Sequence, residues 1–189
     1  LMQKIDQLIK KKKDEILFFG YLKEYSFIFY HLDYKVFPKL KNLFKKSDND
    51  NKNLVTKENF YGNRWHLNNE PQILNILKNQ AENKFNIKIK KIDSNSGIDC
   101  RNLDHFKPHI DSSIAKINIL IMISGPTAVI NCTVFYHGDL NNYDLDIHVG
   151  FRENRAVMFP SNKIHSQHAS VVPNLKRYTS TLFIEDYEE

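Results

Sequence analysis

The sequence predicts a mainly β protein whose core is a double-stranded β-helix (jelly roll), with N-terminal helices packed outside it. Two observations lead to this prediction. Short apolar segments separated by turn residues fill the C-terminal half of the chain, a pattern typical of two-sheet jelly rolls. Apolar residues at helical spacing occur instead in residues 1–84. We therefore expect a mixed helical part over 1–84 and a jelly-roll core over 85–186, within one domain spanning 1–189.

The first elements alternate in type. The apolar spacing over residues 2–19 predicts a helix that ends at Gly20. The aromatic-rich segment Ser26–Leu32 predicts a strand, and Tyr34–Lys46 carries an apolar stripe at helical spacing. The segment Ser47–Lys57 is rich in Asn and Asp and predicts a surface loop.

A clearer helix follows, with Asn69 as its expected N-cap and Pro71 in its first turn. Its apolar residues are expected to face inward: Ile73, Leu74, Ile76 and Leu77. Phe85–Ile92 alternates apolar and basic residues, which predicts a half-buried strand. The polar segment Ser94–His105 is expected to be a loop.

The remaining chain contains short strand candidates, with breaks at Gly125-Pro126, Gly138 and Pro160. The candidates are Lys116–Ile123, Val129–Tyr136, Asp146–Val149, Arg155–Phe159, His165–Val172 and Arg177–Ile184. Strands in close succession with turn residues between them favour two packed antiparallel sheets.

Bulk properties limit the classes of protein. At 189 residues with 41% hydrophobic residues, the chain can bury a sizeable core. The apolar run Ile117–Ile123 is far too short to span a bilayer, so no membrane partner is expected. No signal peptide is evident, and Cys100 with Cys132 makes no disulfide framework, so we expect a cytoplasmic protein.

The net charge of +5 would suit an acidic partner such as nucleic acid. However, the basic excess is spread along the chain, apart from Lys10–Lys13 and the cluster of Lys88, Lys90 and Lys91. A solvated surface therefore explains the charge better than a nucleic-acid groove.

The chemistry is concentrated in His109-Ile110-Asp111, a later histidine and Arg177. Residues i and i+2 of a strand point to one face, so His109 and Asp111 can reach one metal ion. Two imidazoles and a carboxylate can cap one face of Fe(II) and leave positions for a bidentate ligand and O2. A guanidinium downstream can grip a carboxylate through a fork of two hydrogen bonds.

These residues resemble the Fe(II)- and 2-oxoglutarate-dependent dioxygenase superfamily, and within it the small prolyl-hydroxylase-like group. The resemblance rests on His109-x-Asp111, His165, Arg177-Tyr178-Thr179 and the lead-in Arg155–Ser161, and it covers roughly residues 85–186. It implies that His109, Asp111 and the distal histidine hold Fe(II). It also implies that Arg177 and Thr179 bind the C5 carboxylate of 2-oxoglutarate.

Two residues have alternative interpretations. His165 follows Ser161 at the spacing common in that group, whereas His168 is nearer to Arg177, so His168 is the alternative distal ligand. Asn118 lies in an apolar strand, where a buried amide needs a hydrogen-bond partner. It can line the cosubstrate pocket or be a satisfied amide of the core.

The resemblance implies an oxidoreductase that hydroxylates a substrate, consumes O2 and releases succinate and CO2 from 2-oxoglutarate. The substrate is expected to be a peptidyl residue such as proline, a free amino acid or a small metabolite. The alternative is a non-enzymatic, cupin-like jelly roll that binds a metal or another ligand. Oligomeric state and substrate identity have no signal in the sequence.

Overall fold

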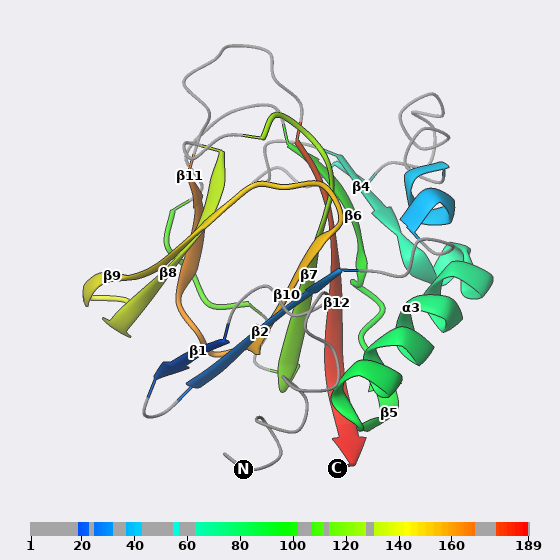
Figure 1. The fold of residues 1–189 in the computed structure, drawn as a ribbon, viewed down its shortest axis with the longest axis horizontal. Coiled ribbons are helices and arrows are strands. Elements are labelled where there is room, and N and C mark those ends of the chain that lie inside the picture. Colours follow the sequence, from blue (N-terminus) through cyan, green and yellow to red (C-terminus); the bar gives the residue numbers. More distant parts are fainter. Residues whose placement is uncertain are drawn as a thin grey trace.

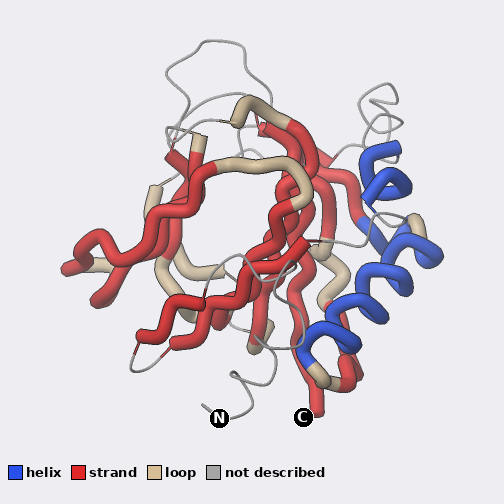
Figure 2. Tube along the Cα trace, in the orientation of Figure 1, coloured by secondary structure: helices blue, strands red, loops and turns tan. Residues whose placement is uncertain are grey.

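The computed structural model describes the secondary structure of residues 19–22, 25–31, 37–42, 55–56, 63–101, 107–111, 114–127, 131–168 and 177–188. Its strands form two antiparallel sheets that enclose a common interior, and helix α3 (Pro71–Phe85) covers the outer face of the larger sheet (Figures 1 and 2). This arrangement confirms the predicted mainly β fold with a jelly-roll core and helical cover.

The larger sheet has the strand order β1-β2-β10-β7-β12-β6-β4-β3, and β5 also pairs with β12. Its strands are β1 (Phe19–Leu22), β2 (Tyr25–His31), β3 (Val55–Thr56), β4 (Asn63–His66), β5 (Lys88–Ile92), β6 (Gly97–Arg101), β7 (Ile117–Ser124), β10 (Arg155–Pro160) and β12 (Arg177–Glu188). The smaller sheet has the order β11-β8-β9, with strands β8 (Cys132–Asp139), β9 (Asn142–Gly150) and β11 (His165–His168).

The larger sheet buries its two faces in different surroundings. On β7, Ile119 and Ile121 belong to the apolar core that includes Leu77 of α3. Met122, the next residue along β7, points to the opposite face and packs with Phe135 of the smaller sheet. Because side chains alternate along a strand, one face of this sheet supports the helix and the other lines the space between the sheets.

Helix α3 is held by its apolar face, with Leu77 and Ala81 buried. Asn69 was predicted to cap it, but Asn69 ends a 3-10 turn (Leu67–Asn69) and Glu70 occupies the N-cap position. At the other end Asn86 adopts the left-handed conformation (φ 53°) typical of a helix C-terminus. Residues 37–42 are also helical, within the predicted Tyr34–Lys46 helix.

Other predictions need correction at particular elements. Gly20 lies inside β1, so no helix ends there, and residues 2–18 lie outside the described part of the chain. The predicted loop Ser94–His105 contains β6, and β3 lies within the predicted loop Ser47–Lys57. Phe85 ends α3, so the strand predicted from Phe85 begins only at Lys88.

The N-terminal third contributes strands as well as helices. β2 pairs with β10, and β4 pairs with β6, so residues of the first third extend the sheet that carries the later strands. No helix in the described part of the chain is long and apolar enough to cross a membrane.

Candidate metal centre

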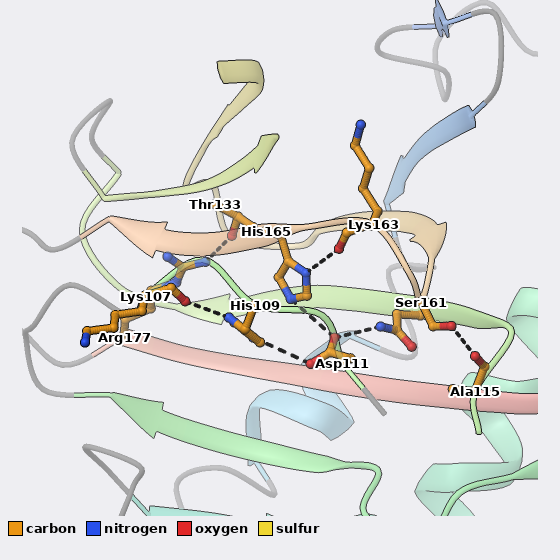
Figure 3. A network of polar contacts seen from close by, with 10 residues as sticks. Lys107, His109, Asp111, Ala115, Thr133, Ser161, Lys163, His165 and Arg177 are labelled. Carbon is orange, nitrogen blue, oxygen red and sulfur yellow. Dashed lines mark hydrogen bonds and ion pairs between the residues drawn. The ribbon is translucent and has the colours of Figure 1, made fainter. Parts of the chain in front are cut away.

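The segment 107–111 lies beside β11 through an isolated antiparallel bridge between His109 and His165. Each of the two residues donates its amide to the other's carbonyl at 3.0 Å. Residues directly opposite one another in such a pair project to the same side, and the two imidazole centroids lie 4.4 Å apart (Figure 3). The bridge thus joins two histidines that are 56 positions apart in the sequence.

Asp111 completes a cluster of three metal-ligating side chains. Its Oδ1 lies 3.6 Å from Nε2 of His109, and its Oδ2 lies 3.3 Å from Nε2 of His165. One potential ligand atom from each residue lies within 4.8 Å of the other two. Three donors that converge from one side leave the opposite side of a bound ion open to other ligands.

The backbone fixes the protonation pattern of both imidazoles. Nδ1 of His109 lies 2.9 Å from the Lys107 carbonyl, and Nδ1 of His165 lies 2.9 Å from the Lys163 carbonyl (Figure 3). A carbonyl only accepts hydrogen bonds, so each Nδ1 carries a proton and Nε2 is the ring atom that faces Asp111. Either a proton on Nε2 or a bound cation can bridge each ring to the carboxylate, and a metal ion would use the two Nε2 lone pairs. The donor set therefore fits a metal ion.

The electrostatics keep the carboxylate ionised. Burial alone would raise the pKa of Asp111, but hydrogen bonds to His109 and His165 and the charge on these rings outweigh burial, so the net pKa lies well below its usual range. Asp111 is therefore an anion at neutral pH, as a metal ligand must be.

The two imidazoles differ in exposure. The His165 side chain is 11% exposed and packs against Phe159 and Phe135, with ring centroids 5.1 and 6.0 Å away. The His109 side chain is 30% exposed. The cluster is therefore walled beside His165 by one aromatic ring from each sheet, Phe159 of β10 and Phe135 of β8, and is accessible from the side of His109.

Arg177 reaches into the same interior from the start of β12. Its guanidinium donates to the Cys132 carbonyl at 2.8 Å and to Oγ1 of Thr133 at 2.7 Å, and it lies over the Phe151 ring at 5.3 Å. The side chain is almost fully buried. Thr179 is also buried and lies two residues further along the same strand, on the same face.

The register of the smaller sheet relates Arg177 to the histidine cluster. Phe135 of β8 pairs with His165, and Thr133, which binds Arg177, lies two residues earlier in β8. Two residues along a strand correspond to about 7 Å. The guanidinium is therefore anchored on β8 about 7 Å from Phe135, the residue that pairs with His165.

Asn118 contacts the cluster directly. It is fully buried on β7, and its Nδ2 donates to Oδ2 of Asp111 at 2.7 Å. Asn118 is thus placed against a predicted metal ligand.

His168, the alternative distal ligand, ends β11 opposite Cys132, and its side chain lies outside the described part of the structure. The group of described residues that could hold a metal ion consists of His109, Asp111 and His165, so within the described structure the distal histidine of that group is His165.

The sequence offered no signal for several supporting residues. Thr133 orients Arg177, and Lys163 forms a buried ion pair with Asp146 at 2.5 Å. Ser161 donates to the Ala115 carbonyl, which ties the turn after β10 to the residues before β7. Only Ser161 belonged to a motif noted in the sequence, because the other contacts depend on pairing between distant strands.

Comparison with known proteins places this geometry in context. No family model matches the sequence, and no curated protein matches it. A prolyl hydroxylase from Trichoplax adhaerens, in complex with a hypoxia inducible factor oxygen degradation domain peptide fragment, is 11% identical. It matches with a TM-score of 0.63 over 98% of this chain and 92% of that chain.

Two further structures share the fold. A Pseudomonas putida prolyl-4-hydroxylase is 8% identical, with a TM-score of 0.54 over 95% of this chain and 97% of that chain. The epimerase SnoN from nogalamycin biosynthesis, in complex with Fe3+, alpha ketoglutarate and nogalamycin RO, is 10% identical. Its TM-score is 0.60 over 100% of this chain and 85% of that chain. The chain therefore has the fold of the Fe(II)- and 2-oxoglutarate-dependent oxygenases, small prolyl hydroxylases included, as its motifs indicate.

Proposed function

We propose that this protein is an Fe(II)- and 2-oxoglutarate-dependent dioxygenase that hydroxylates a small molecule or a peptide. The observation that carries the proposal is the convergence of two backbone-oriented Nε2 atoms on the ionised carboxylate of Asp111. In this proposal His109, Asp111 and His165 hold the metal ion.

Bound Fe(II), together with 2-oxoglutarate and O2, would supply the oxidising power for C–H hydroxylation and release succinate and CO2. The protein's own residues bind the metal ion, orient its ligands and exclude water from the site. The carbonyls of Lys107 and Lys163 aim the two imidazoles, and Phe135 and Phe159 wall the side of His165. A dry wall strengthens the electrostatic contacts within the site.

Arg177 is proposed to bind the distal carboxylate of 2-oxoglutarate, and Thr179 to line the same pocket. The Cys132 carbonyl and the Thr133 hydroxyl orient the guanidinium, and a fixed guanidinium binds a carboxylate through a planar fork. Thr133, which binds the guanidinium, lies about 7 Å along β8 from Phe135, the residue that pairs with His165. That separation is on the scale of a five-carbon dicarboxylate whose other end chelates a metal ion.

The substrate class is supported by the structural neighbours. One is bound to a peptide fragment and another to nogalamycin RO, so this fold accommodates peptides and small molecules. For this chain we propose a peptidyl residue such as proline, a free amino acid or a small metabolite. We do not propose a nucleic-acid substrate. Two lysines of the basic cluster, Lys90 and Lys91, form ion pairs with Glu188 and Glu185, so their charges are already compensated within the protein.

An anaerobic titration of the metal-free protein with Fe(II) and 2-oxoglutarate tests the proposal. We expect a weak visible charge-transfer band that requires both additions. In Arg177→Gln, which keeps hydrogen-bonding capacity but removes the charge, the band should need a much higher 2-oxoglutarate concentration at an unchanged iron affinity. Bound iron without the band would instead indicate a cupin-like metal-binding module, and a protein that binds no iron would refute the proposal.

A further inference from the structure

Asn118 occupies a position where an amide is costly. It is 0% exposed, and its cross-strand neighbours on the same face of the larger sheet are Phe159 and Phe183. A buried amide between two aromatic residues loses its hydration and needs hydrogen bonds in compensation. An apolar residue would suit these neighbours better, so the amide must be explained by what it contacts.

The amide is satisfied at one end. Nδ2 donates to Oδ2 of Asp111 at 2.7 Å, whereas Oδ1 is buried and has no hydrogen-bond partner among the described residues. Exchanging the two amide atoms would place an oxygen against the carboxylate, so this orientation is the favourable one. The Asn118 side chain therefore makes one strong hydrogen bond, to Asp111, while its Oδ1 stays buried without a donor among the described residues.

Asp111 depends on that contact for its position. The residue lies in the irregular segment 107–111, outside the regular strands. Its Oδ2 lies 3.3 Å from Nε2 of His165 in the smaller sheet and also accepts the hydrogen bond from Asn118 of the larger sheet. Asn118 is thus the described link between the carboxylate and the larger sheet.

We propose that Asn118 is a positioning residue that holds the Asp111 carboxylate toward the two imidazole Nε2 atoms, in preference to binding the cosubstrate itself. The inference rests on the metal-binding part of the proposed function. Contacts to metal ligands of this kind typically contribute about 10- to 100-fold to metal affinity. The buried acceptor that is left unsatisfied means that the residue adds little to the stability of the metal-free protein.

The test compares Asn118→Leu, which keeps the size but removes the donor, with Ser180→Ala. Ser180 is a suitable control because it is also fully buried on the larger sheet and its hydroxyl also has no hydrogen-bond partner in the described part of the chain. It lies on the other face of the sheet, since Arg177 and Thr179 alternate with it along β12. Mn(II) affinity, the ligand-field spectrum of the Co(II)-saturated protein and thermal unfolding of the metal-free protein are measured for each.

For Asn118→Leu we expect about 10- to 100-fold weaker Mn(II) binding, an altered Co(II) spectrum and an unchanged or higher melting temperature. Ser180→Ala should leave the affinity and the spectrum unchanged. Asn118→Ala, which adds no branched bulk to the packed interior, should reproduce the loss of affinity if Asn118→Leu does not fold.

Unchanged Mn(II) affinity and an unchanged spectrum in the Asn118 variants, beside a wild type that binds metal, would overturn this inference alone. A drop in melting temperature without a change in metal binding would do the same, because it would make Asn118 a structural amide. A wild-type protein that binds neither Mn(II) nor Co(II) would overturn the inference together with the proposed function.

Discussion

The two histidines of the cluster are oriented in the same way but supported differently. In both, Nδ1 lies 2.9 Å from the carbonyl of the lysine two residues earlier, Lys107 for His109 and Lys163 for His165. His165 lies in a regular strand between aromatic rings, whereas His109 lies in a short segment joined to that strand by an isolated bridge. Direction therefore comes from the local backbone, and rigidity comes from packing.

Removal of the carboxylate shared by both histidines should have the largest effect. We expect Asp111→Ala to reduce succinate formation from 2-oxoglutarate to background, since two neutral imidazoles bind Fe(II) poorly without an anionic ligand. Succinate is measured by chromatography, and circular dichroism checks that the variant is folded. Undiminished succinate formation in a folded variant would show that the metal site is elsewhere.

Individual alanine substitutions of the two histidines should separate their role in binding the metal ion from their role in packing. Both His165→Ala and His109→Ala should weaken Mn(II) binding by more than about 100-fold, beyond the loss expected for a supporting contact. Only His165→Ala should also destabilise the metal-free protein, by about 2 kcal/mol, because it leaves a cavity beside Phe159. His109→Ala should stay within about 0.5 kcal/mol of wild type in urea unfolding.

His168→Ala is the control for this pair, since it should leave Mn(II) affinity unchanged if His165 is the distal ligand. Loss of affinity in His168→Ala but not in His165→Ala would transfer the ligand role to His168. Equal destabilisation by His109→Ala and His165→Ala would show that the segment 107–111 holds its histidine as rigidly as β11 does.

A smaller effect on the metal is expected from the ion pair of Lys163, the residue whose carbonyl orients His165. Lys163 is 3% exposed and pairs with Asp146 on β9. Asp146→Asn removes the acidic partner of a buried ammonium group, which should cost about 3 kcal/mol and weaken Mn(II) binding by up to about 10-fold. Urea unfolding and Mn(II) titration measure the two effects, and stability equal to wild type would contradict the supporting role of the pair.

The smallest effect is expected from Lys107, the lysine two residues before His109. Lys107 is exposed and contributes its carbonyl, not its ammonium group, to His109. Lys107→Ala should therefore change stability by no more than about 0.5 kcal/mol and leave Mn(II) affinity unaltered in the same titration. A clear loss of affinity would show that the side chain also serves the site.

Much of the fold was predictable where the local pattern agrees with the final environment. Each strand from β7 onward was predicted, with shifted boundaries, and β7, β8, β10 and β12 contain the apolar runs that gave the clearest pattern. β6 was missed because Gly-Ile-Asp-Cys-Arg has few strand-forming residues, and it is a strand because it pairs with both β12 and β4. Sequence alone carries no record of such long-range pairing.

The candidate site shows the same division. His109, Asp111 and His165 were selected as ligands because their side chains carry the chemistry, and the structure brings them together. The carbonyls that aim the imidazoles have no side-chain signature, and the Thr133 contact of Arg177 joins residues 44 positions apart. The contact between Asn118 and Asp111 was hidden for a related reason, because an amide in an apolar strand has several possible partners.

The isolated bridge between His109 and His165 has a consequence for the free energy of unfolding. A cation bound to both residues would act as a cross-link that closes a long loop of the chain, much as a disulfide restricts the unfolded ensemble. Since only the folded protein presents all three ligands together, metal binding would add to the free energy of unfolding. Metal occupancy would then set how often the segment 107–111 detaches from β11.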